Sequence, residues 1–130
     1  MPISTLAAWH AFIESDDLKK LEALLADDAV FYSPIVHTPQ TGKAMTLKYL
    51  TAATHVLGSH ASFHYVREIA QGNDAVLEFN AEIDGIHIDG IDMFRWNDAG
   101  LITEFKVFVR PLKAINLLHQ KMAAMLAQAR

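Results

Sequence analysis

The chain of 130 residues contains no cysteine, no excess of basic residues and no long apolar run. Without cysteine, a disulfide framework and a thiolate metal site are both excluded. No apolar stretch reaches membrane length, and the N-terminus lacks the basic, apolar and small-residue pattern of a signal sequence. A formal net charge of −4 without a Lys/Arg cluster argues against nucleic-acid binding. These absences predict a soluble, cytoplasmic protein with neither a membrane nor a nucleic-acid partner.

What the chain does contain is enough apolar sequence for a core. Hydrophobic residues make up 52% of it and charged residues 20%, which argues against disorder. Its length fits one domain, and no repeat, low-complexity segment or Gly/Ser-rich linker divides it. We therefore expect a single domain over residues 1–130.

The first half of the chain has helical periodicity. Ser4 can cap a first helix, and either Asp16 or Asp17 can cap a second, because each precedes apolar residues at helical spacing. Two prolines and a glycine then indicate a loop. The further elements expected here are a short strand, this loop and a third helix, over residues 28–33, 34–42 and about 43–56.

After Gly58 the pattern alternates, which is typical of strands with one buried face. Turn signals separate four expected strands, at residues 61–70, 75–83, 86–96 and 101–110. Pro111 suits the first turn of a closing helix over about residues 111–128. Helices followed by antiparallel strands predict an α+β fold, in which a sheet curved around its helices forms a cone with an apolar interior.

Asp92 is the most informative residue of the chain. Alternate strand residues share a face, so Asp92 shares its face with apolar neighbours and glycine, and it is the only polar side chain there. Burying a lone carboxylate is costly unless the group is paired or its pKa is raised. Because perturbed groups cluster at functional sites, Asp92 is a candidate catalytic or binding acid. The alternative is a structural role, near a rim or bonded to a neighbouring group.

Several segments resemble the NTF2-like superfamily, particularly its SnoaL-like and steroid delta-isomerase-like branches. The motifs that agree in order and spacing are WHAFIESDDL (9–18), LADDAVFYSP (25–34), IDMFRW (91–96) and GLITE (100–104). The resemblance implies an NTF2-like (cystatin-like) cone: N-terminal helices packed on a strongly curved, mostly antiparallel sheet, with an added C-terminal helix. This fold hosts many unrelated chemistries and also non-enzymes.

Comparison with the isomerases places Asp92 where they keep a protonated carboxylic acid in their oxyanion hole. Their general-base aspartate falls on Ser33, and their oxyanion-hole tyrosine falls on Trp9. A serine without a base cannot abstract a proton from carbon, so steroid isomerisation by the family mechanism is not expected. His37, in the loop after Ser33, is a candidate base. Ser33, His37 and Asp92 resemble a hydrolytic set by residue type alone; the simpler interpretation is a turn-capping serine and a solvated histidine.

Other polar residues give weaker signals. The seven histidines show no pair at metal-ligand spacing beside a carboxylate, so we predict neither a metal nor a cofactor. Arg95 alternates outward, whereas Arg67 can reach Asp92 from another strand. His64 lies on the side of its strand opposite Phe63 and Tyr65.

The resulting hypothesis is a protein that binds a small apolar cyclic or aromatic molecule, with isomerase, cyclase, dehydratase or hydrolase chemistry. Its candidate catalytic residues are Asp92, His37 and Ser33. The residues expected to bind the ligand are Trp9, Phe12, Phe79, Phe94, Phe105, Val107 and Val109. A non-catalytic binder is the second hypothesis.

A third hypothesis is an interaction module that uses the outer sheet face. Apolar residues alternate with charges there, which predicts a homodimer through Ile91, Met93, Ile102 and Phe108. The closing helix can cover the pocket mouth, pack on a second subunit or pack on its own domain.

Overall fold

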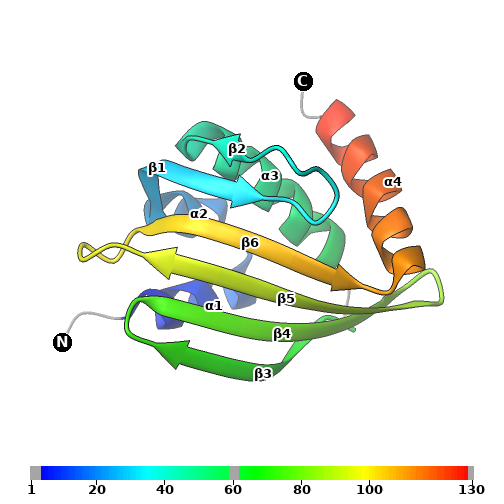
Figure 1. Cartoon of the computed structure of the whole chain (residues 1–130), viewed down its shortest axis with the longest axis horizontal. Coiled ribbons are helices and arrows are strands. Elements are labelled where there is room, and N and C mark those ends of the chain that lie inside the picture. Colours follow the sequence, from blue (N-terminus) through cyan, green and yellow to red (C-terminus); the bar gives the residue numbers. More distant parts are fainter. Residues whose placement is uncertain (1–3, 59–61, 129–130) are drawn as a thin grey trace.

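The computed structural model describes residues 4–58 and 62–128 and has four helices and a six-stranded sheet in those ranges (Figure 1). The helices are α1 (Thr5–Ser15), α2 (Leu18–Leu24), α3 (Lys43–Gly58) and α4 (Leu112–Gln128). The strands are β1 (Leu25–Tyr32), β2 (Gln40–Thr41), β3 (His64–Gln71), β4 (Asp74–Ile83), β5 (Ile86–Trp96) and β6 (Ile102–Arg110). The predicted α+β class is confirmed; the expected strand start at residue 61 lies outside the described residues.

Local side-chain bonds explain where the first two helices begin. The Ser4 hydroxyl accepts a hydrogen bond from the Ala7 N–H, which satisfies one of the free donors at the start of α1. Asp16 adopts a left-handed conformation (φ 55°) that ends α1, and the Asp17 carboxylate caps α2 by accepting from the Lys19 N–H. The choice that the sequence left between two aspartates is thus resolved in favour of Asp17.

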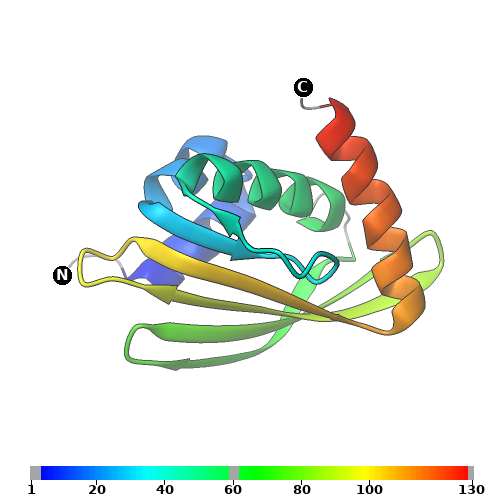
Figure 2. The same ribbon diagram turned by 45° about the horizontal axis from the view of Figure 1, so that its top comes forward.

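The strand order is β2-β1-β6-β5-β4-β3, and the only parallel pair in this sheet is β1 with β6. The β4–β5 hairpin turns at Asp84 and Gly85, which both have positive φ (53° and 76°), as a two-residue turn that follows strand twist requires. Helices α1, α2 and α3 cover one face of the sheet, and α4 stands at the sheet's end beside α3 (Figures 1 and 2).

A β-bulge changes which residues of β6 face the core. Arg95 pairs with Glu104 and Trp96 pairs with Ile102, so Thr103 has no counterpart on β5. An extra residue reverses the alternation on its far side. Ile102 is therefore fully buried, and the prediction that it belongs to an outer contact surface is wrong.

The core lies between the sheet and its helices. Three aromatic rings lie at its centre. The ring centroid of Trp9 in α1 lies 4.9 Å from that of Phe105 in β6, and Phe94 of β5 stacks on Phe105 with centroids 5.3 Å apart. Asp92 projects from β5 toward the same interior. No helix within the described ranges is long and apolar enough to cross a membrane.

Candidate active site

Asp92 occupies the middle of the sheet, opposite Leu77 of β4 and Val107 of β6. Its side chain is buried, with 7% exposed, and it is the only carboxylate in this state among the described residues. Loss of solvation in these surroundings raises the pKa of Asp92 from its usual 3.8 to about 7, although a hydrogen bond from Tyr65 works in the opposite direction. Near neutral pH the carboxyl therefore exists in both forms and can either donate or accept a proton.

Tyr65 of β3 is the direct partner of Asp92. Its hydroxyl donates to Asp92 Oδ2 at 2.7 Å, and it accepts from Trp9 Nε1 at 3.0 Å. Burial and the negative charge of Asp92 hold the pKa of Tyr65 well above its usual 10, so the phenol stays protonated. The three side chains form a directed chain of hydrogen bonds from Trp9 through Tyr65 to Asp92. We call it the Asp92 chain.

Aromatic rings fix the position of Tyr65. The Tyr65 ring packs edge-on against His10 and Phe63, with centroids 5.6 and 5.3 Å away. His10 in turn contacts Glu68 at the surface, where His10 Nε2 lies 2.5 Å from Glu68 Oε1. The phenol of Tyr65 is thus held in place from the core side and from the surface side.

Gly90 makes room for this arrangement. It lies on the same face of β5 as Asp92, two residues earlier, and opposite Phe79 of β4. A Cβ on Gly90 would lie only 2.2 Å from Cζ of the Phe79 ring, so only glycine fits there. The Phe79 ring therefore lies over the Gly90 backbone, 6.5 Å from the Tyr65 ring.

Asp92 opens into a small cavity of about 30 Å³, which we call the narrow chamber. Its walls are Asp92, Tyr65, Trp9, Phe105 and Val107, together with residues of α1, α3 and the segment before β3. A volume of this size accommodates about one water-sized group. The narrow chamber thus fits a single oxygen-bearing group beside Asp92 and excludes a ring.

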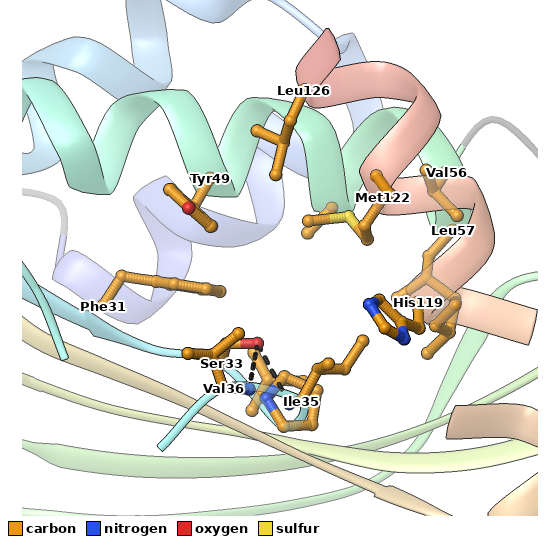
Figure 3. Close-up of a pocket in the computed structure, with 15 residues that line it drawn as sticks. Phe31, Ser33, Ile35, Val36, Tyr49, Val56, Leu57, His119, Met122 and Leu126 are labelled. Atoms are coloured by element: carbon orange, nitrogen blue, oxygen red, sulfur yellow. Dashed lines mark hydrogen bonds between the residues drawn. The ribbon is translucent and has the colours of Figure 1, made fainter. Parts of the chain in front are cut away.

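A second cavity of about 170 Å³, the wide chamber, lies between the end of β1, α3 and α4. Figure 3 shows its side chains around the open space, with the His119 ring of α4 turned toward it. Its surface is mostly apolar, and Ser33, Tyr49 and His119 supply the hydroxyl and imidazole groups. Pockets with this balance of apolar wall and few polar groups are typical small-molecule sites.

The structure places Asp92 apart from the other two predicted catalytic residues. The Ser33 hydroxyl accepts from the N–H groups of Ile35 and Val36, at 3.0 and 3.5 Å, so it stabilises its own turn at the edge of the wide chamber. His37 lines a groove on the outer side, beside Lys106, and Ser33 borders that groove as well. Asp92 lines the narrow chamber only. Neither Ser33 nor His37 therefore shares a cavity wall with Asp92.

The predicted ligand-binding residues also divide. Trp9, Phe105 and Val107 line the narrow chamber, and Val107 lines the wide chamber as well. Core positions behind the walls are occupied by Phe12, Phe79 and Phe94, whereas Val109 borders grooves outside the two chambers. Arg67, considered as a partner of Asp92, instead faces Glu78 on the outer side, 3.8 Å away.

Three polar residues of these cavities were not recognised in the sequence: Tyr65, Tyr49 and His119. The sequence placed Tyr65 only on the side of its strand opposite His64, because the partner of its hydroxyl depends on the pairing of strands distant in sequence. Tyr49 and His119 belong to helices whose apolar stripes dominate their pattern. Within the described ranges no group of three or more His, Cys, Asp or Glu side chains is arranged to hold a metal ion.

The α+β fold, with a buried acid facing a small apolar cavity, is that of an NTF2-like domain. Residues 6–105 match the family model of the SnoaL-like domain, so the chain belongs to the SnoaL-like family. None of the curated proteins compared with this sequence matches it.

Solved structures extend this relationship. A steroid delta-isomerase from Pseudomonas aeruginosa is 38% identical with a TM-score of 0.87, covering 96% of this chain and 90% of that chain. A bacterial protein with a cystatin-like fold from Silicibacter pomeroyi is 30% identical with a TM-score of 0.83, covering 92% and 83%. An NTF2-like protein from Cytophaga hutchinsonii, 18% identical with a TM-score of 0.64 over 88% and 97%, shares the fold.

Proposed function

We propose that this protein is an acid–base enzyme that acts on a small, mostly apolar carbonyl compound, with Asp92 donating a hydrogen bond to the carbonyl oxygen. The observation that carries the proposal is the Asp92 chain facing the narrow chamber. A raised pKa of about 7 leaves a large fraction of Asp92 protonated at neutral pH, as a donor to carbonyl oxygen requires. The similarity to a steroid delta-isomerase supports carbonyl chemistry of this kind.

Each member of the Asp92 chain has a distinct role in the proposal. Tyr65 donates its hydrogen bond to Asp92 Oδ2 and so orients the carboxyl group. The other oxygen, Oδ1, then carries the proton that is donated to the substrate. Trp9 orients Tyr65 by donating to its hydroxyl oxygen. As the Asp92 proton moves to the carbonyl oxygen, water removes a proton from the neighbouring carbon, which gives the enol. Addition of a solvent proton to that carbon and return of the oxygen proton to Asp92 restore the carbonyl compound and the acid. A polarised carbonyl is the common requirement of isomerase, cyclase and hydrolase chemistry.

Non-catalytic binding is the second candidate, and a specific observation favours it. The described lining of the narrow chamber includes neither a second carboxylate nor a histidine that can act as base. In that case Asp92 orients a ligand by the same hydrogen bond, and no proton leaves carbon.

Deuterium exchange separates these two functions. The probe is 2-tetralone, an apolar bicyclic ketone with exchangeable protons beside its carbonyl, incubated with the protein in D₂O and followed by NMR. We expect wild-type protein to accelerate exchange and Asp92→Asn to lose about 100-fold or more of that acceleration, in the range of general acid catalysis. Binding without accelerated exchange selects the binder, and an absence of Asp92-dependent binding refutes both functions.

We also propose that the chain forms a homodimer through its outer sheet face. Phe108 is 47% exposed there, and Ile91 and Met93 lie partly exposed on the neighbouring strand. Sheet faces with apolar residues among charges suit self-association. Sedimentation should show a dimer for wild type and a monomer for Phe108→Asp; an unchanged dimer for this variant contradicts the proposed contact.

A further inference from the structure

Val107 stands between the two chambers. It is the direct cross-strand neighbour of Asp92, so the two side chains leave the same face of the sheet about 5 Å apart at Cβ. Val107, Ala53 and Leu57 line both the narrow and the wide chamber. The two cavities are therefore separated by a wall one side chain thick, made of three apolar residues.

The two chambers accept different parts of a molecule. About 30 Å³ beside Asp92 fits one oxygen-bearing group, whereas about 170 Å³ on the other side of Val107 fits one or two fused rings. A ligand with its rings in the wide chamber reaches Asp92 only with a group that projects past Val107. Substituents on both sides of that group would collide with the wall.

The outer wall of the wide chamber comes from α4. Leu118, His119, Met122, Ala123 and Leu126 supply it, and all five lie beyond residues 6–105, which match the family model. Helix α4 is held against the rest of the domain by a salt bridge between Lys121 Nζ and Asp84 Oδ2, 3.2 Å apart. The buried side chain of Ala114 packs in the core beneath it. The element that sets the shape of this chamber is thus separate from the part of the chain that defines the family.

We propose that the two chambers form one binding site partitioned by Val107, whose ligand is a compact one- or two-ring apolar molecule with a projecting, unhindered oxygen, selected by the wall of α4. This inference rests on the proposed function, because it takes Asp92 as the group that binds the oxygen. It adds that Val107 and Met122 determine which rings are accepted.

The test compares 2-tetralone with tetralin, the same ring system without the oxygen. In wild-type protein we expect bound 2-tetralone to give nuclear Overhauser effects to the methyl groups of both Val107 and Met122, and to bind about 10-fold more tightly than tetralin. Val107→Phe should abolish that preference by blocking the projecting oxygen, while tetralin still binds. Met122→Ala should weaken both probes by roughly 5-fold through lost apolar contact.

Met125→Ala is the matched control, since Met125 is a half-buried methionine of the same helix that does not line the chamber. It should leave the binding of both probes unchanged. Overhauser effects to Val107 without Met122, or full oxygen preference in Val107→Phe, would overturn the single-site inference even if Asp92→Asn abolishes exchange. If Asp92→Asn changes neither exchange nor oxygen preference while the Met122 effects persist, the proposed function fails instead.

Discussion

Asp92 lines the narrow chamber and Ser33 lines the wide chamber, and the two polar side chains differ in where their hydrogen-bond partners lie in the sequence. Ser33 is satisfied by N–H groups two and three residues away, so its hydroxyl serves the turn that carries it. Asp92 accepts a hydrogen bond from Tyr65, 27 residues away in sequence, and its burial raises its pKa in spite of that bond. The difference indicates that Ser33 stabilises structure locally, whereas Asp92 reduces stability at neutral pH and retains chemical reactivity.

The largest expected effect comes from removing the ionisable group. Because the pKa of Asp92 is about 7 in the folded state and near 3.8 otherwise, the folded protein holds the proton more tightly than the unfolded chain. The contribution of Asp92 to the free energy of unfolding is fully present below about pH 4. About 4 kcal/mol of it is lost as the pH rises from about 4 to about 7. Asp92→Asn does not titrate, so its unfolding free energy relative to wild type should rise by about 4 kcal/mol between pH 4 and pH 8.

Urea unfolding at both pH values measures this change. Asp89→Asn is the matched control, because Asp89 lies on the outer face of the same strand and pairs there with Arg110 at 3.2 Å. It reports the general effect of losing one negative charge from β5. A difference between Asp92→Asn and wild type that stays constant with pH would show that the carboxyl is not desolvated in the folded state.

A smaller effect is expected where the narrow chamber meets the core. Gly90→Ala places a methyl group into the Phe79 ring, and overpacking of this kind costs about 1–3 kcal/mol. Thermal unfolding should show the loss, and Phe79→Leu in the same chain should restore part of it. Gly58→Ala is the control, since nothing lies within 4 Å of its added Cβ. Equal stability of the two alanine variants would mean that the Phe79 ring does not lie over the Gly90 backbone.

The smallest effects belong to the loop of residues 33–37. Ser33→Ala removes the acceptor for two backbone N–H groups and should lower the unfolding free energy by about 0.5–1.5 kcal/mol. His37→Ala should change it by less than about 0.5 kcal/mol and leave 2-tetralone exchange unaltered, because His37 lies in the outer groove. Loss of exchange in His37→Ala would restore His37 as a base and remove the contrast with Asp92.

Much of the fold could be predicted because its signals are local. Helical spacing, alternation and turn residues located the main helices and strands, and the motifs around Trp9 and Asp92 indicated the superfamily. Two-residue β2, inside the predicted loop, was too short to leave a pattern. Ile102 was misplaced because alternation assumes an unbroken strand, and the bulge at Thr103 depends on the pairing of β5 with β6.

The candidate site could be predicted only in part, as Asp92 and three of the residues that line the narrow chamber with it, Trp9, Phe105 and Val107. Asp92 was identified by its place on an apolar strand face, which a sequence displays directly. Its partner Tyr65 was missed: the comparison with the isomerases put Trp9 in the place of their tyrosine, whereas the phenol beside Asp92 comes from Tyr65 of β3. Trp9 supports that phenol by an indole N–H from α1. Such contacts depend on register and helix position, which no local pattern contains.

The pKa of Asp92 is the most direct measurement of the central claim. Carboxyl-carbon NMR of uniformly ¹³C-labelled protein, titrated from pH 3 to pH 9 with Asp92→Asn for assignment, follows this one group in the folded state. We expect a midpoint at about 7. A midpoint near the usual 3.8 would show a solvated, ionised carboxylate and would contradict the proposal that Asp92 donates a proton in the narrow chamber.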